Sequence, residues 1–397
     1  MRMNRDGNTK INMRGLLPRR ITMISVTAVL ACCAFEALLF GRRTILCESY
    51  DSSETTHTAA EVEPTHPFTF CVETPSRCAT LHQNRRFSFL HISKSGGASW
   101  ILELRKLNLG SLFPTLEAGP EHGLLYHNRA SGAFHHLYHH LTSLRSPRHH
   151  TWSLWAECRF NGWAKELTNG TDFPNTGATP EEDVRDFGVW INHFVSSGPN
   201  GARLNTKVMD YYNCYHPANY QTRAFISGDW NPHGPMGEDQ LIPNVELANQ
   251  TAFYFDFLAI TEFFHESKCL LFYRVRPRTT EMEAYLDQTC HCQKEIASNW
   301  TDINYPHYQG RRRHTMLDLD ARLLDKIAAL TTTDTIIYRT ALHQFMVEMS
   351  WLEASLNRRV VCNEVLDKWE NELAYLNLSV TSLYQQQKKK RIIPAVR

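Results

Sequence analysis

The stretch FSFLHISKSGGASW, residues 87–100, decides the fold class that we expect. FSFLHI is an apolar run typical of a buried strand, the glycines of SKSGGAS let the backbone approach a ligand, and WILELRKL has the apolar spacing of a helix. A strand, a loop with a lysine and a helix N-terminus form a cradle for phosphate, because backbone N–H groups and the positive helix end face the anion. The lysine precedes the glycines, so this is not a Walker A loop. An ordinary strand-to-helix turn with an exposed Lys94 is the alternative.

A second segment, HLYHHLTSLRSPRHHTWSLWAEC at residues 136–158, repeats this pattern. The apolar LTSL leads into the loop RSPRHH and then into a predicted helix. Arg145 stands at the end of the strand and Ser153 in the first or second turn of the helix. Arginine offers a forked set of donors and serine a hydroxyl, which together suit a second phosphate. Two anion sites in one α/β sheet indicate a nucleotide that is phosphorylated at two positions.

The composition is that of a globular protein, since 397 residues with 42% hydrophobic and 11% aromatic side chains can bury a large core. Lys and Arg number 42 against 41 Asp and Glu, so no nucleic-acid partner is expected and an anionic ligand must be bound by a local cluster. Short apolar runs alternate with helical patterns, which predicts one α/β domain at residues 86–380 with a mostly parallel sheet. Near its end we expect two helices on either side of TTTD, the second capped near Thr333 or Asp334.

The N-terminus predicts a membrane anchor at residues 21–40, an apolar segment that would span about 30 Å as a helix. Residues 1–20 are basic and are expected to stay in the cytosol, which places the rest of the chain in a lumen. A cleaved signal peptide is the alternative. Residues 41–85 are polar and rich in Ser and Thr, as in a stem, and residues 381–397 are expected to form a basic tail, in which QQQKKKRIIPAVR at 385–397 is solvated.

Sequons and cysteines agree with a lumenal location. Four asparagines stand in Asn-x-Ser/Thr triplets that would be glycosylated if exposed: Asn169, Asn249, Asn299 and Asn377. Of the 11 cysteines, nine lie beyond the anchor, so one is expected to be free or intermolecular, and Cys47 is the candidate. Cys290-His-Cys292 lacks a second pair at zinc-finger spacing, so we expect these cysteines to form disulfides rather than hold a metal.

The two loop segments resemble the signatures of the Golgi sulfotransferases that use 3′-phosphoadenosine 5′-phosphosulfate (PAPS), in particular the heparan sulfate 2-O and 6-O and uronyl 2-O enzymes. HISKSGGAS at 91–99 is similar to H-I-x-K-[ST]-G-G-x-S, and LRSPRHHTWS at 144–153 is similar to L-R-[DS]-P-x-x-[RH]-x-x-S. Weaker resemblances are PANYQTRAF at 217–225 and FLAITEFFHESKCLLFY at 257–273. The family resemblance implies a three-layer α/β sandwich with a P-loop-like nucleotide site.

The resemblance also implies roles for single residues. The first loop would surround the 5′-phosphosulfate with Lys94, Ser95, Gly96, Gly97, Ala98 and Ser99. Arg145 and Ser153 would bind the 3′-phosphate, and Lys94 would stabilise the charge on the leaving phosphate. The implied reaction transfers the sulfuryl group from PAPS to a hydroxyl of a glycan or polysaccharide, without a metal, in the Golgi lumen. The acceptor is expected to be anionic, and a homodimer is left open.

The attacking hydroxyl requires a base, a role for which histidine is suited near neutral pH. Family members of the 2-O type have Y-H-G-H between the two nucleotide motifs. YHNRAS at 126–131 aligns His127 with the first histidine and places Arg129 at the second. His127 is therefore the first candidate and His122 the second, while most other histidines between 122 and 150 are expected at the surface or in strands. Arg129 is a candidate for contact with an acidic group of the acceptor.

Four further features have two interpretations each. Glu262 fits a structural carboxylate paired with a core arginine better than a catalytic group, and Arg223 fits a ligand contact or a loop contact equally. The basic run 311–313 suits either a polyanion or a solvated loop. Asp318-Leu-Asp320 would be the metal signature of a Golgi glycosyltransferase, although it also fits the acidic start of a helix. A carbohydrate-binding relative that has lost its base is the remaining alternative.

Overall fold

The structure is a computed structural model that describes residues 81–82, 86–106, 138–160, 179–198, 201–205, 214–226, 241–253, 255–292, 316 and 319–392. The chain divides into two units, Met1–Pro67 and Phe68–Arg397, and all described residues belong to the second. The predicted anchor at 21–40, the segment before it and Cys47 lie outside the described residues. Within the described part of the chain, no helix has the length and apolar character needed to cross a membrane.

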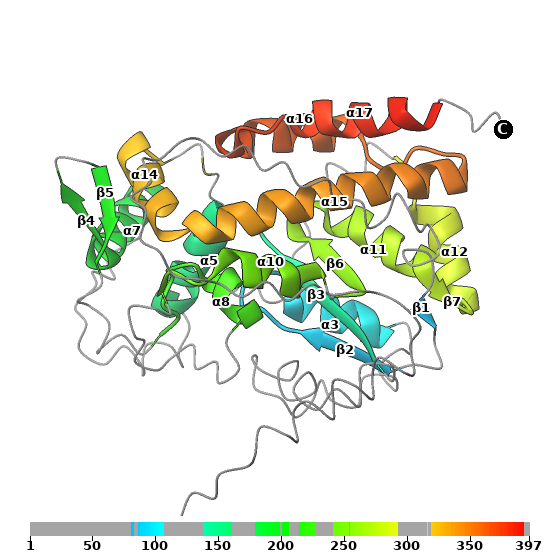
Figure 1. Cartoon of the computed structure of the whole chain (residues 1–397), viewed down its shortest axis with the longest axis horizontal. Coiled ribbons are helices and arrows are strands. Elements are labelled where there is room, and N and C mark those ends of the chain that lie inside the picture. Colours follow the sequence, from blue (N-terminus) through cyan, green and yellow to red (C-terminus); the bar gives the residue numbers. More distant parts are fainter. Residues whose placement is uncertain are drawn as a thin grey trace, which may run out of the picture. The chain divides into compact units, whose positions relative to one another are not determined.

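Three parallel strands lie at the centre of the second unit (Figure 1). They are β2 (Arg86–Leu90), β3 (Tyr138–Leu144) and β6 (Phe257–Ile260), in the order β2-β3-β6. Leu90 lies opposite Thr142 and Leu144 lies opposite Ile260, so the carboxyl ends of all three strands meet at one edge of the sheet. The predicted α/β class with a parallel sheet is thereby confirmed, although the sheet is small.

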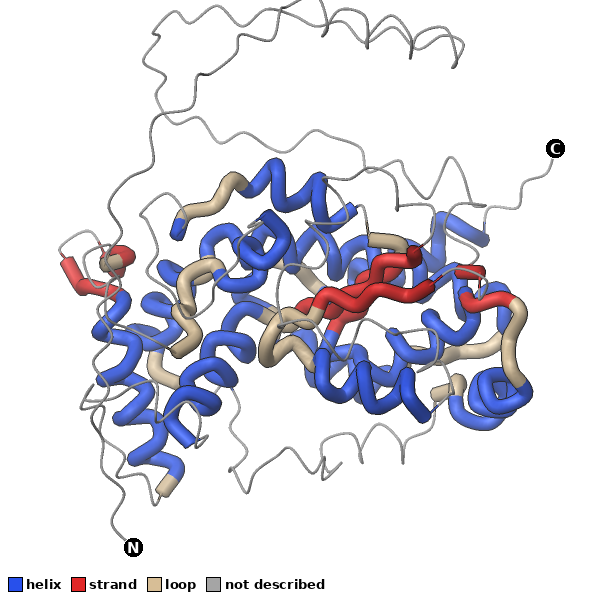
Figure 2. The backbone as a smooth tube through the Cα atoms, turned by 90° about the horizontal axis from the view of Figure 1, so that it is seen from below, coloured by secondary structure: helices blue, strands red, loops and turns tan. Residues whose placement is uncertain are grey.

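A helix follows each central strand. The connections run from β2 into α3 (Gly97–Lys106), from β3 into α5 (Pro147–Phe160), and from β6 through η3 (Thr261–Phe263) into α11 (Phe264–Arg274). Figure 2 shows this central sheet in red, with helices around it. Parallel strands require such crossover connections, and ligands of open α/β sheets bind beyond the carboxyl ends of the strands.

The remaining elements surround this centre. Short sheets pair β1 (Leu81–His82) with β7 (Val275–Arg276) in parallel and β4 (Val195–Gly198) with β5 (Gly201–Leu204) in antiparallel orientation. The other helices are α7 (Pro180–Phe194), α8 (Tyr220–Ile226), α10 (Val245–Phe253), α12 (Thr280–Thr289), α14 (Ala321–Leu330), α15 (Thr332–Leu356), α16 (Asn363–Glu372), η6 (Ala374–Leu376) and α17 (Val380–Ile392).

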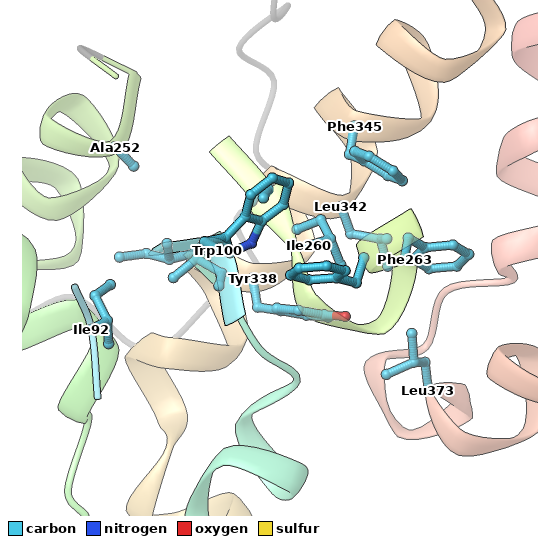
Figure 3. Packing of buried hydrophobic residues seen from close by; sticks show 14 of the residues in the cluster. Ile92, Trp100, Ala252, Ile260, Phe263, Tyr338, Leu342, Phe345 and Leu373 are labelled. Atoms are coloured by element: carbon cyan, nitrogen blue, oxygen red, sulfur yellow. The ribbon is translucent and has the colours of Figure 1, made fainter. Parts of the chain in front are cut away.

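The long helix α15 organises the core, because it contacts β6 as well as α8, α10, α11 and α17. Its side chains Tyr338, Leu342 and Phe345 are buried against the residues that end β6. In the close view of Figure 3 they lie beside Ile260 and Phe263. The apolar face of α15 therefore packs against the carboxyl end of β6 and holds it in place.

The two helices predicted around TTTD are present, with a different cap. Helix α14 ends at Leu330 and α15 begins at Thr332, earlier than predicted. The carboxylate of Asp334 does not cap α15 but accepts the N–H groups of Gln221 and Thr222 at 3.2 and 2.7 Å. A buried carboxylate requires hydrogen-bond donors, and here the first turn of α8 supplies them.

Part of the segment 381–397 is packed against the domain rather than solvated. Helix α17 extends to Ile392, and Leu383 and Tyr384 are buried. Glu353 of α15 accepts the Tyr384 hydroxyl at 2.5 Å and pairs with the Lys388 amine at 2.9 Å. Within the stretch expected to be solvated, Gln387 is buried and Lys388 is half-buried, so its first residues also pack against the domain.

Three disulfides join the described elements: Cys158–Cys214, Cys269–Cys290 and Cys292–Cys362. The prediction that Cys290 and Cys292 form disulfides is confirmed, and each pairs with a different partner. Glu364 lies close to the last pair, yet the two sulfurs are bonded to each other and are not thiolate ligands.

Candidate functional site

The two predicted anion loops lie side by side at the carboxyl edge of the sheet, because β2 and β3 are neighbouring parallel strands. The loop after β2 carries Lys94, and the loop after β3 carries Arg145. The guanidinium Nη1 of Arg145 donates to the carbonyl oxygen of Lys94 at 3.2 Å. The structure therefore brings together the two residues that the sequence selected from separate segments.

Every carbonyl of the first loop from Ile92 to Gly96 accepts a hydrogen bond from within the protein. The donors for 92, 93, 94 and 96 are Ser95 N, the His150 ring, Arg145 Nη1 and Trp100 N. The Ser95 carbonyl accepts two, from the hydroxyls of Ser143 at 2.5 Å and Thr261 at 2.8 Å. Because its carbonyls are engaged in this way, the loop can present N–H groups to an anion.

Helix α3 starts directly after this loop and adds its positive end. The N–H groups of Gly97, Ala98 and Ser99 have no acceptor within the helix, by α-helical geometry. The first turn of α3 has no acidic residue that would neutralise this end. The arrangement has the features of an anion-binding helix N-terminus.

The two adjacent glycines each have a steric reason. Gly96 has a φ of +81°, in the left-handed region that favours glycine. At Gly97, a Cβ would lie 1.9 Å from the Cδ2 atom of His91, which no side chain tolerates. The GG pair is therefore required by this loop, whether or not a ligand binds.

Lys94 is itself in a left-handed conformation, with a φ of 66°. Its amine pairs with Oε2 of Glu157 at 2.6 Å, and the side chains of the two residues are 26% and 11% exposed. Sequence reasoning missed Glu157, which lies one helical turn beyond Ser153 on α5. That i, i+4 spacing, which puts both residues on one helix face, is the signal that was available. Ser153 is half-buried in the second turn of α5.

Gln221 of α8 connects the two loops and was also missed. Its Oε1 accepts the hydroxyl of Ser95 at 3.1 Å and the N–H of Arg145 at 2.8 Å. Its Nε2 donates to the carbonyl of Arg145 at 2.8 Å. Ser95 is 0% exposed, so its hydroxyl holds the loop in place rather than pointing out of it.

The buried groups around Gln221 are structural. Burial raises the pKa of Asp334 to about 6, an effect that its bonds from Thr222 and Gln221 oppose. Burial lowers the pKa of Arg223 to about 10, and this guanidinium donates to the carbonyl of His216 at 2.7 Å. Of the two interpretations of Arg223, the structure favours the one in which it fixes a loop.

Glu262 is a buried carboxylate of η3 that lies next to the start of α5, and its partners among the described residues are not the expected arginine. Its Oε1 accepts the N–H of Ser146 at 2.8 Å, and its Oε2 accepts the hydroxyl of Tyr338 at 2.7 Å. The Ser146 hydroxyl in turn contacts Tyr375 and His149 at 3.0 Å. Glu262 therefore ties the loop after β3 to α15, where backbone and phenol donors satisfy its charge.

His150 connects α5 to the first loop. Its pKa is lowered to about 3, mainly by burial and in part by the positive charges of Arg145 and Lys94, although its bond to Ser93 opposes the shift. The neutral ring donates from Nε2 to the Ser93 carbonyl at 2.7 Å, since that carbonyl can only accept. His139, His140 and His149 are buried as well, so the described histidines of this interval fill the core.

The candidate bases His127 and His122 lie outside the described residues, and so does Arg129. The same holds for the sequons at Asn169 and Asn299, for the run 311–313 and for Asp318. Of the two described sequons, Asn377 is exposed and Asn249 on α10 is half-buried. Asp320 caps α14 by accepting the N–H of Leu323 at 2.8 Å, which favours the helix-start interpretation of the Asp-x-Asp pair.

The chain matches no model of a protein family, and it shows no significant similarity to a curated protein or to a solved structure. Functional inference for this chain therefore depends on the sequence motifs and on the contacts around the two loops.

Proposed function

We propose that the chain is a PAPS-dependent carbohydrate O-sulfotransferase with a P-loop-like nucleotide site in a three-layer sandwich. The enzyme would be a single-pass type II protein of the Golgi membrane with its catalytic domain in the lumen. The observation that carries the proposal is the contact between Arg145 and Lys94 across two adjacent strand–loop–helix units. One nucleotide phosphorylated at both ends of its ribose is the ligand class that uses both loops.

In this proposal the first loop binds the 5′-phosphosulfate. The N–H groups at the start of α3 would face its oxygens, and Lys94 would contact the bridging oxygen. Arg145 and Ser153 would bind the 3′-phosphate from the neighbouring unit. The hydrogen bonds of the first loop support the assignment of the 5′-phosphosulfate to it. The carbonyls of residues 92–96 all accept hydrogen bonds within the protein, so they do not face an anion.

The reaction is an in-line transfer. The acceptor hydroxyl oxygen forms a bond to sulfur while the bond from sulfur to the bridging oxygen breaks, and that oxygen keeps the electron pair on the departing 5′-phosphate. The hydroxyl proton passes to a base, for which His127 is the first candidate and His122 the second. Lys94 offsets the charge that develops on the departing oxygen. No step requires a metal ion.

The test uses the purified full-length chain, radiolabelled PAPS and heparan sulfate as acceptor. We expect Lys94→Ala and Arg145→Ala each to lower transfer by at least about a hundredfold while the thermal midpoint stays close to that of the wild type. Lys268→Ala is the control, since Lys268 also pairs with a buried carboxylate, that of Glu103. A variant of either loop residue that retains the normal rate would refute the role assigned to it.

Two parallel measurements separate the proposal from its alternatives. Consumption of a sugar nucleotide in the presence of manganese, without sulfate transfer, would identify a glycosyltransferase. Binding of adenosine 3′,5′-bisphosphate without any turnover would identify a non-catalytic relative. Both assays use the same preparation, so a positive result in either of them shows that a negative sulfate assay does not arise from a misfolded sample.

A further inference from the structure

The amine of Lys94 is not free to act as an isolated positive charge in the candidate site. It pairs with the carboxylate of Glu157 at 2.6 Å, and both side chains are mostly buried. Glu157 belongs to α5, the helix of the second anion unit, whereas Lys94 belongs to the loop of the first. The ion pair therefore joins the two units across the position that we assign to the donor.

The direction of the Lys94 side chain is set by its backbone. The left-handed φ of 66° is held by hydrogen bonds to the carbonyls on both sides of it, from His150 to Ser93 and from Arg145 to Lys94 itself. The amine has three N–H donors, so it can donate to a phosphate oxygen while it stays paired with Glu157. An anion bound there would lie within a few ångströms of the Glu157 carboxylate, whose repulsion is strong in a partly buried site.

We propose that Glu157 is a positioning residue that acts as a resident counter-ion of Lys94 and limits the affinity of the site for the 5′-phosphate of the nucleotide product. The inference rests on the proposed function. Transfer of the sulfuryl group leaves the 5′-phosphate with an additional ionisable oxygen close to Lys94. Repulsion by Glu157 then acts more strongly on this phosphate than on the donor, and it favours release of the product.

The distinctive consequence is that removing a buried carboxylate improves ligand binding. In Glu157→Gln, the amide oxygen still accepts from Lys94, but the negative charge is absent. We expect this variant to bind adenosine 3′,5′-bisphosphate more tightly, on the order of tenfold, in isothermal titration calorimetry at fixed ionic strength. Its kcat and the KM for PAPS should both fall, because the product dissociates more slowly. A residue with a merely structural role would weaken binding.

Two matched variants control the measurement. Glu103→Gln removes a similarly buried carboxylate from the ion pair with Lys268, between α3 and α11, and should leave the affinity unchanged. Glu157→Asp retains the charge and should keep the affinity near that of the wild type. The inference would be overturned if Glu103→Gln bound more tightly than the wild type, or if Glu157→Asp bound as tightly as Glu157→Gln. In either case the gain in affinity would not arise from the charge at position 157.

A second pair of variants keeps the inference testable if Glu157→Gln does not fold. In Lys94→Met the carboxylate of Glu157 has lost its counter-ion, so nucleotide binding should be weak. The double variant K94M/E157Q should bind more tightly than K94M, and equal or weaker binding overturns the inference. If the wild type itself does not bind the nucleotide, the proposed function fails and this inference with it. If the wild type binds and E157Q binds no more tightly, only the inference fails.

Discussion

Replacement of Gln221 by alanine tests whether one side chain holds both anion loops. The substitution removes the acceptor of the Arg145 N–H, the donor to the Arg145 carbonyl and the acceptor of the Ser95 hydroxyl. A buried polar group that loses its partner costs about 1–3 kcal/mol. Three such groups set an upper range of roughly 3–9 kcal/mol, and water that enters at the half-buried Arg145 reduces it. We expect Gln221→Ala to lower the free energy of unfolding by about 3 kcal/mol.

The assay is urea denaturation followed by tryptophan fluorescence, together with titration of adenosine 3′,5′-bisphosphate. Nucleotide affinity should fall at least about tenfold, since Arg145 and the first loop lose their common support. Gln250→Ala is the matched control, because Gln250 makes one exposed hydrogen bond to Glu246 and its loss should change stability by less than about 0.5 kcal/mol. A loss below about 1 kcal/mol for Gln221→Ala would refute the assignment of Gln221 as the connection between the loops.

Two further predictions concern glycine and pH. Gly97→Ala places a Cβ 1.9 Å from the His91 ring and should destabilise the fold by about 1–3 kcal/mol. Gly188→Ala in α7 meets only Leu323 at 3.5 Å and should stabilise the fold by about 1 kcal/mol. Urea denaturation measures both changes, and equal effects would contradict the steric argument. His150 has a folded-state pKa of about 3, below its unfolded value, so the unfolded chain takes up the proton first and stability is lost as pH falls below about 7. His150→Gln should therefore lose about 2 kcal/mol less than the wild type between pH 7 and pH 5 in urea denaturation, and parallel losses would show that His150 does not carry this dependence.

The local part of the site could be predicted from the sequence, because its signals are local. The apolar run, the lysine and the glycine pair of residues 87–100 stand in the order in which the structure uses them. Parallel strands share one carboxyl edge, so placing Lys94 and Arg145 at the ends of two strands already restricted the distance between them.

The connections between the loops could not be predicted, since they depend on tertiary contacts over long stretches of chain. Glu157 lies 63 residues from Lys94 in sequence, and Gln221 lies 126 residues from Ser95. Asp334 was expected to cap its own helix, where an acidic residue commonly stands, but it caps α8 instead. In each case a polar side chain has a good local explanation that competes with the distant partner it finds in the fold.

The conformation of Lys94 links the strain in the first loop to its chemistry. A left-handed φ costs a residue with a Cβ about 1–2 kcal/mol, and glycine at this position would avoid that cost. Glycine would also lack the amine that pairs with Glu157. The carbonyls of residues 92–96 are bound by donors from several elements, and these bonds hold the loop in the conformation that strains Lys94. These same bonds occupy the carbonyls of the loop, so the interactions that hold the strained residue also leave the N–H groups at the start of α3 as the groups that an anion would meet.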